Sequence, residues 1–211
     1  FLSQKADVPI FEAYSGALFP PPADWPEGGW EVFGNFKIPG TKQKELAEKG
    51  GSFYGGSLFQ KCADFIAAGS PPVYIGWGSM IVKSGGFMCR LAVGALKEAG
   101  QRAIIVSGWA KLDVDLLDGT EEGDDELKAF CADNVLFVKA APHEWLFPQC
   151  ICAVHHGGIG TTQASISAGL PTIVTPVLAD QWDISENLTR RKVGCGTGVT
   201  LAKVTSTILA E

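Results

Sequence analysis

The amino-acid sequence predicts an α/β protein built on a Rossmann-like parallel sheet with helices on both faces. Three observations support this prediction: short apolar runs, helical segments between these runs, and polar residues that directly follow them. Strands of a parallel sheet are covered by helices on both faces, so they are continuously apolar and do not alternate with polar residues. With 211 residues, 46% of them hydrophobic, the chain can bury a core of ordinary domain size.

Residues 1–70 lack this alternation of strands and helices. The proline-rich stretch at 19–26 is expected to be extended, because proline fixes its own φ and disfavours helix in the residue before it. Residues 42–49 suggest a short helix, the glycine pair at 55–56 a loop, and residues 58–68 a second short helix with one apolar face. We therefore expect residues 1–70 to form a connector and irregular lead-in that covers a domain surface.

From residue 71 onward, strands and helices alternate, and residues 71–211 are expected to form one Rossmann-like domain. The acidic, glycine-containing segment 113–125 suggests a solvated loop. Helix ends are marked by Gly100 and Gly169, residues that often follow the last turn of a helix. The predicted strands are 73–77, 103–106, 135–138, 151–154 and 172–175, and the predicted helices are 87–99, 161–168 and 182–193.

Polar residues cluster directly after the predicted strands. In open parallel sheets, ligands bind beyond the carboxyl ends of the strands, near the point where the strand order reverses. The clusters that follow strands in this sequence are Ser79, residues 107–109, His143, residues 155–162, and Asp180 with Gln181. The sequence therefore predicts a ligand site at this edge of the sheet.

The densest cluster is the sequence HHGGIGTT at residues 155–162, between a predicted strand and a predicted helix. Glycines allow a ligand to approach the backbone, and free N–H groups at a helix N-terminus attract anions such as a diphosphate. The threonines add hydroxyl donors and are good helix caps. The structural alternative is a tight turn capped by threonine. The spacing G-G-x-G differs from a dinucleotide fingerprint, and no Gly-Lys-Ser/Thr of a Walker loop follows.

Composition argues against several other classes of protein. The formal net charge is −6 and no basic run occurs, which disfavours a nucleic-acid partner held by phosphate contacts. The longest apolar runs are far shorter than the roughly 20 residues of a membrane-spanning helix. The six cysteines lack metal-site spacing and are interpreted as reduced core thiols, so no metal is expected.

Taken together, five motifs in this order resemble the donor-binding half of the GT-B UDP-glycosyltransferases, and in particular the sterol 3-β-glucosyltransferases. The motifs are PVYIGWGSM at 72–80, SGW at 107–109, PHEWLFP at 142–148, HHGGIGTT at 155–162, and AGLP at 168–171 with Pro176, Asp180 and Gln181. The resemblance extends over about residues 19–199. It implies that residues 71–211 form the nucleotide-sugar-binding domain, and that the N-terminal acceptor domain is absent from this chain.

The resemblance also implies roles for individual residues. His156 would donate an imidazole N–H to the donor diphosphate, and Ser79 would reach the β-phosphate. Asp180 and Gln181 would hydrogen-bond sugar hydroxyls, for which a carboxylate and an amide supply suitable acceptors and donors. The backbone and hydroxyl cradle around the phosphates corresponds to Gly158, Gly160, Thr161 and Thr162.

Other interpretations of these residues remain open at this stage. Trp109 either borders the uracil or closes the core, and His143 either contacts the base through its backbone or has a structural role. His155 is a weaker candidate because its neighbour occupies the motif position. The structural alternatives for the remaining residues are core packing for His156, a capped helix start for Asp180 and Gln181, and a plain turn for Ser79.

Two positions depart from the plant branch of this family. There a tryptophan stacks on uracil at the position of Ala140, and a glutamate holds the ribose at the position of Ala164. The sterol-like branch often lacks both residues. UDP therefore stays the expected nucleotide, although its base is less firmly specified than its phosphates.

The implied activity is inverting, metal-independent transfer of a hexose from a UDP-sugar, with UDP-glucose expected, to a sterol or other lipid hydroxyl. No cofactor is expected, because the UDP-sugar is a substrate. The general base is expected in the absent N-terminal domain, so this chain alone would bind nucleotide without transferring sugar. The alternatives are the same chemistry on another small apolar acceptor, or a non-catalytic structural or binding module. The expected location is cytoplasmic, with contact to a membrane surface left open.

Overall fold

The computed structural model describes residues 10–25, 30–50 and 58–211, which fall into two compact units, Phe1–Lys37 and Ile38–Glu211. The first unit contains a two-stranded parallel sheet of β1 (Ile10–Glu12) and β2 (Trp30–Val32), which the sequence did not predict. The proline-rich stretch is not wholly extended, because the Trp25 N–H donates to the Pro22 carbonyl across a turn. The loop predicted at 55–56 lies outside the described residues.

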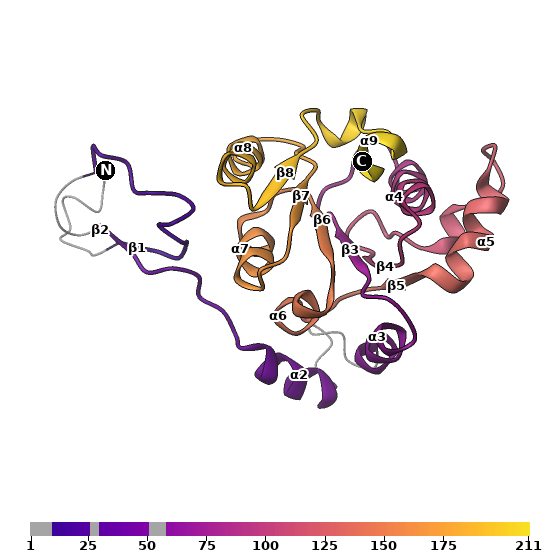
Figure 1. Ribbon diagram of the computed structural model, residues 1–211, viewed down its shortest axis with the longest axis horizontal. Helices are drawn as coiled ribbons and strands as arrows, with labels where there is room; N and C mark the ends of the chain where they lie inside the picture. The colour runs from indigo at the N-terminus through magenta and orange to yellow at the C-terminus, as the bar shows by residue number, and fades with distance from the viewer. Residues whose placement is uncertain (1–9, 26–29, 51–57) are drawn as a thin grey trace. The chain divides into compact units, whose positions relative to one another are not determined.

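The second unit contains a six-stranded sheet in which every neighbouring pair is parallel (Figure 1). This confirms the predicted fold class, and all five predicted strands are present with small differences in their ends. The strand β8 was not predicted, because its two glycines and one cysteine carry no strand signal. The strands are β3 (Val73–Gly76), β4 (Ala103–Val106), β5 (Val135–Val138), β6 (Cys152–His155), β7 (Thr172–Val174) and β8 (Gly194–Gly196).

The order of the strands in the sheet is β5-β4-β3-β6-β7-β8. The chain begins at the centre with β3, builds outward through β4 to β5, and then returns to the centre for β6. The strand order therefore reverses between β3 and β6, where Gly76 is aligned with His155. In sheets of this kind a ligand crevice opens beyond the carboxyl ends of the two strands that flank the reversal.

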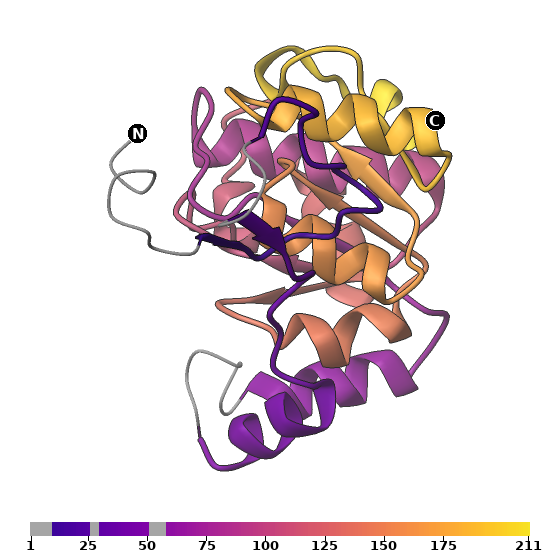
Figure 2. The same ribbon diagram turned by 90° about the vertical axis from the view of Figure 1, so that its left-hand side faces the viewer.

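Helices cover both faces of the sheet (Figures 1 and 2). One core contains the apolar side of α4, which packs against β3, β4 and the C-terminal residues Leu201, Val204 and Leu209. The opposite core contains Tyr74 and Ile104 of the sheet, packed against residues of α3, α6 and α7. The helices are α2 (Gly40–Glu48), α3 (Leu58–Ala67), α4 (Gly85–Ala99), α5 (Asp124–Asn134), α6 (His143–Leu146), α7 (Ile159–Ser167), α8 (Gln181–Arg191) and α9 (Ser206–Ala210), with 3₁₀ turns η2 (Val114–Leu116), η3 (Phe147–Gln149) and η4 (Leu201–Lys203).

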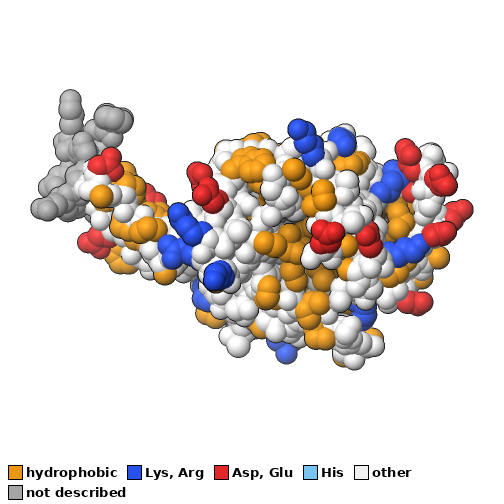
Figure 3. Space-filling view, turned by 45° about the horizontal axis from the view of Figure 1, so that its top comes forward, with side chains coloured by type: hydrophobic (Ala, Val, Ile, Leu, Met, Phe, Trp, Pro, Cys, Tyr) orange, Lys and Arg blue, Asp and Glu red, His pale blue; other side chains and the backbone are white. Residues whose placement is uncertain are grey.

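The prediction of a solvated loop at 113–125 was wrong in part. The turn η2 lies within this segment, and α5 begins at Asp124. Its first turn carries Asp124, Asp125 and Glu126, a placement that the helix dipole favours. The acidic run therefore belongs to a helix start, and Figure 3 shows red acidic side chains gathered over the α5 end of this unit.

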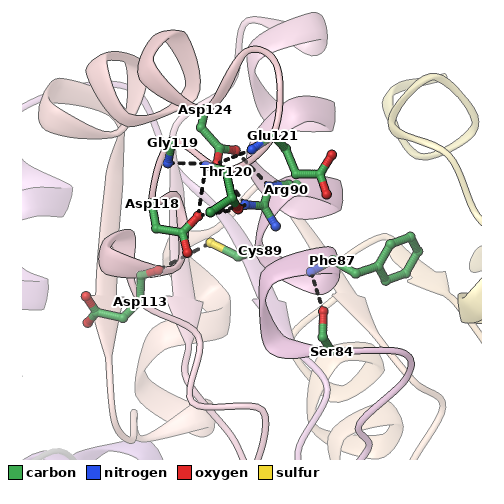
Figure 4. A network of polar contacts seen from close by, with 10 residues as sticks. All are labelled: Ser84, Phe87, Cys89, Arg90, Asp113, Asp118, Gly119, Thr120, Glu121 and Asp124. Atoms are coloured by element: carbon green, nitrogen blue, oxygen red, sulfur yellow. Dashed lines mark hydrogen bonds and ion pairs between the residues drawn. The ribbon is translucent and has the colours of Figure 1, made fainter.

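A charged contact anchors the segment before α5 onto α4 (Figure 4). The guanidinium of Arg90 donates to both carboxylate oxygens of Asp124, at 2.7 Å each. The backbone N–H groups of Gly119 and Glu121 donate to the same carboxylate, and the Asp124 side chain is only 1% exposed. These hydrogen bonds hold the pKa of Asp124 down to about 2, so the carboxylate is ionised throughout the physiological range.

Two sequence expectations about single residues also need correction. Thr161 does not cap α7, because the helix begins at Ile159 and Gly158 occupies the N-cap position. Among the cysteines, Cys62, Cys89 and Cys131 are buried as expected, whereas Cys195 is exposed on β8. All six thiols are free. No helix in the described ranges is both long and apolar enough to cross a membrane.

Substitution of Asp124 by alanine is expected to lower the melting temperature by several degrees. The change leaves Arg90 without its bidentate partner and two backbone N–H groups without an acceptor. Thermal unfolding followed by circular dichroism would measure the effect. The matched control is Glu126→Ala, because Glu126 pairs with Lys97 in an exposed contact that adds little stability. Equal melting temperatures for the two variants would contradict this role of Asp124.

Candidate functional site

The polar residues that follow β3, β6 and β7 come together at the carboxyl edge of the sheet. A Cβ added to Gly78, after β3, would lie 3.2 Å from Cε1 of His156, after β6. A Cβ added to Gly157 would lie 3.3 Å from Cα of Gln181, after β7. Gly157 has a φ of +96°, a conformation that favours glycine and turns the chain into α7. The sheet therefore assembles one site from three predicted clusters that are remote in sequence.

The N-terminus of α7 presents free backbone donors to this site. The helical hydrogen bonds of α7 begin with the backbone N–H of Thr162, which donates to the carbonyl of Gly158. Among the described residues, the N–H groups of Ile159, Gly160 and Thr161 have no hydrogen-bond acceptor, and no side chain caps the helix. A Cβ placed on Gly160 would meet no atom within 4 Å, so the space beside the first turn of α7 is open. Three converging donors at a positive dipole end form an anion site.

His156 lies beside this helix end with its ring partly buried. Its Nδ1 atom is buried and has no partner within the described part of the chain. Burial holds the pKa of His156 below its usual value, an effect that the nearby Asp180 carboxylate partly opposes. The ring is therefore neutral near pH 7 and carries a single N–H. A buried N–H without an acceptor costs more than a buried lone pair, so we assign the proton to Nε2, which is free to donate to a ligand.

His155 has a different function from its neighbour. Its ring is fully buried, and Nδ1 accepts the N–H of Gly157 at 3.0 Å. Burial lowers its pKa to about 3, so the ring stays neutral. His155 thus shapes the turn that leads into α7, in agreement with its expected status as the weaker of the two candidates.

The loop between β7 and α8 carries Asp180 and Gln181. Asp180 is exposed at the start of α8, and its side chain makes no capping hydrogen bond. The Oε1 atom of Gln181 accepts the N–H groups of Val177 and Leu178 at 2.8 and 3.1 Å. Its Nε2 points to the sulfur of Met80 at 3.6 Å. In this structure Asp180 is available to a ligand, whereas the Gln181 amide holds the loop in place.

A cleft of about 470 Å³ adjoins the helix end. Ser79 and Thr161 line it, and the hydroxyl of Ser79 has no partner among the described residues. Trp109 also lines it with 71% of its surface exposed, so this ring does not close the core. Thr162 does not reach it, because its buried hydroxyl donates to the Gly158 carbonyl at 2.9 Å. A planar group could stack on the free face of Trp109.

The ring of His143 is used mainly for packing. It stacks on Phe147 with centroids 4.7 Å apart, and its Nε2 shares a hydrogen bond of 2.9 Å with the Tyr74 hydroxyl. Burial lowers the pKa of His143 to about 4. The residue also lines the cleft, so a ligand there could contact it.

Lys139 and Gln43 bring long polar side chains to the cleft, and neither was found from the sequence. Lys139 directly follows β5, so its position at a strand end was a usable signal. Gln43 belongs to α2, a segment interpreted as connector, and it reaches the cleft through contacts with α6 about a hundred residues later. Nothing local in the sequence marks it. In the described residues, no group of three or more His, Cys, Asp and Glu side chains could hold a metal ion.

A model of one protein family matches about half of this chain. The family model of the erythromycin biosynthesis protein CIII-like C-terminal domain matches residues 103–211, from β4 to the last residue. The chain belongs to this family. The match covers α7, the β7–α8 loop and most of the cleft walls, so the site described above lies within or beside the matched region.

Curated relatives extend the match across the whole chain. The sequence is 33% identical to a sterol 3-beta-glucosyltransferase of Saccharomyces cerevisiae, over 100% of this chain and 16% of that protein. It is 32% identical to the Candida albicans enzyme of the same name, over 99% of this chain and 13% of that protein. A sterol 3-beta-glucosyltransferase of Arabidopsis thaliana is 37% identical over 66% of this chain and 21% of its own length. The chain therefore spans only a small part of each of these relatives.

Solved structures confirm the predicted fold. The chain superimposes on Os79 from O. sativa in complex with UDP with a TM-score of 0.70 and 19% identity, covering 100% of this chain and 47% of Os79. A second Os79 structure, with UDP and deoxynivalenol-3-glucoside, gives a TM-score of 0.56 and 18% identity over 71% of this chain and 34% of that one. Because the sequence identities are this low, the two superpositions show a shared fold and nothing more specific.

The buried neutral histidines predict a stability that falls in mild acid. Each ring has a folded-state pKa well below the ordinary 6.5, so the unfolded chain takes up protons first as the pH drops. The free energy of unfolding therefore has its full value above pH 6.5 and decreases as the pH falls toward 4. Between pH 7 and 5, His143 and His155 are each expected to reduce the free energy of unfolding by about 2 kcal/mol.

Urea unfolding at pH 7, 6 and 5 tests this expectation. His143→Gln keeps an amide beside Tyr74 but removes one titrating ring, so the loss between pH 7 and 5 should be about 2 kcal/mol smaller than in the unmodified chain. A free energy of unfolding that does not change over this range would show that the rings are not held neutral.

Proposed function

We propose that this chain is the donor-binding part of a UDP-sugar-dependent glycosyltransferase, with UDP-glucose as the donor. The observation that carries the proposal is the group of three free N–H donors at the start of α7, beside the neutral ring of His156. This arrangement suits a diphosphate, and the adjoining cleft of about 470 Å³ has room for a nucleoside. Exposed Asp180, whose carboxylate lies close enough to act on the His156 ring, would supply an acceptor for sugar hydroxyls.

The same groups would assist departure of the nucleoside diphosphate. Negative charge develops on the β-phosphate as the bond to the anomeric carbon breaks. Donors fixed beforehand stabilise that charge without reorganising during the reaction, which makes them effective in the transition state. In the proposed mechanism, the β-phosphate oxygens accept hydrogen bonds from the α7 N–H groups, the His156 Nε2–H and the Ser79 hydroxyl.

The proposed acceptor is a sterol or other lipid hydroxyl, supported by the names of the relatives described above. Attack from the face opposite the diphosphate would invert the anomeric carbon and requires a general base near the acceptor. We place that base outside the 211 residues, because the acceptor would bind to a part of the protein beyond them. A cytoplasmic location, with contact to a membrane surface when the acceptor is membrane-dissolved, belongs to the same proposal.

Calorimetric titration with UDP and UDP-glucose, without added metal, tests donor binding. Both ligands are expected to bind saturably, and His156→Ala should weaken binding at least tenfold through loss of a charge-assisted hydrogen bond. The control is Glu186→Ala, which changes an exposed position on α8 away from the site. A folded chain that binds neither ligand would contradict the proposal and favour a non-catalytic module.

Gly160 allows a second test that separates folding from binding. The Gly160→Ala variant should be as stable as the original or up to about 1 kcal/mol more stable, because the added Cβ meets no atom and alanine favours helix. The same methyl group would add bulk to the first turn of α7, where we propose that the phosphates bind, so the affinity for UDP should drop at least tenfold. Unchanged affinity in this variant would place the phosphates elsewhere.

A further inference from the structure

We propose that Gln43 of α2 recognises the nucleobase, by donating an N–H of its side-chain amide to the carbonyl oxygen at position 4 of a uracil ring. The inference rests on the proposed function and names the part of this site that selects the base. It gives a binding role to a helix that lies outside the alternating strands and helices.

The helix α2 is held close to the cleft by an unusually short approach to α6. Its first residue, Gly40, has no side chain, and a Cβ there would lie 2.6 Å from the carbonyl oxygen of Glu144. Any larger residue would push the two backbones apart. In Figure 1, α2 lies beside α6, and α3 contacts α2 as well. The position of α2 is thus fixed by backbone contact.

The orientation of the Gln43 amide is fixed as well. The backbone N–H of Glu144 donates to Oε1 at 3.0 Å, and this contact identifies the oxygen end of the amide. The opposite end, Nε2, carries two N–H groups and has no acceptor among the described residues. The residue is only 8% exposed and lines the cleft. Among the described residues, the enclosed side-chain atoms without a partner do not include this Nε2, so a ligand or water in the cleft can accept from it.

The surroundings of Gln43 favour a base over a phosphate as the ligand group. Thr161 brings the phosphate-binding end of α7 to the same cleft, while Gln43 enters from the α2–α6 side. The small residues Ala140, Ala141 and Pro142 also line the cleft, and their short side chains leave room for a flat ring. Trp109 supplies an exposed aromatic surface for stacking. A neutral amide donor at this place suits an exocyclic carbonyl.

This geometry predicts discrimination between uracil and cytosine. Uracil has a carbonyl oxygen at position 4, whereas cytosine has an amino group there that would face the N–H groups of Gln43. Two donors in contact leave both without an acceptor, which makes such a mismatch expensive. The chain is therefore expected to prefer UDP to CDP at least tenfold.

The test compares UDP and CDP affinities by calorimetry in four forms of the chain. Gln43→Glu keeps an acceptor for the Glu144 N–H but replaces the donor by an acceptor, so the ratio of UDP to CDP affinity should fall at least tenfold. Gln43→Met, of similar volume and without donors, should lower the UDP affinity and also reduce the ratio. Lys44→Ala, an exposed position on the same helix, should change neither affinity.

Two outcomes would overturn the inference. One of them leaves the proposed function intact, and the other contradicts it as well. If the unmodified chain binds UDP but both Gln43 variants keep its preference over CDP, then Gln43 does not recognise the base and the proposed function stands. If the unmodified chain binds neither nucleotide, the proposed function fails together with this inference. His156→Ala serves as an internal reference, because loss of a phosphate contact should weaken both nucleotides equally.

Discussion

In a parallel sheet every strand ends at the same edge, and the return of the chain from β5 to β6 opens that edge at one place. The residues after β3 and those after β6 face each other there, with Gly76 and His155 in register. The site depends on this constraint, since Ser79, His156 and Asp180 are far apart in sequence. Helix coverage of both faces keeps the strands apolar and leaves the strand ends as the place for polar chemistry.

Burial determines how the histidines act. His143 and His155 lie in the protein interior and are neutral, so they contribute shape and fixed hydrogen bonds and carry no charge. His156 is only partly buried, with one nitrogen enclosed and the other open, which yields a single oriented donor. Without a positive charge in the ring, attraction of an anion depends on the α7 N–H groups and the helix dipole. This agrees with a chain of net charge −6 whose site contains few basic residues.

Local sequence patterns predicted the elements whose signal is contained in a single segment. The five apolar strands and the HHGGIGTT turn were predicted because burial and helix geometry determine them directly. The helix α5 was missed because charge alone does not distinguish a loop from the first turn of a helix. The contact of Gln43 with Glu144 and the inward turn of the Gln181 amide depend on tertiary packing between distant residues. No single segment contains that information.

The loop at 176–180 is held mainly through its backbone. Gln181 binds the N–H groups of Val177 and Leu178, while the side chains of Leu178 and Ala179 are exposed and make little contact with the core. Substitutions of the exposed Leu178 would therefore leave the loop conformation intact, whereas Val177 packs against the core and Ala179 has a φ of +51°, which glycine and asparagine adopt more easily than other residues. An exposed, replaceable side chain thus stands on a backbone that the Gln181 amide holds in place. A different side chain at Leu178 can therefore change the surface beside Asp180 with little risk to folding.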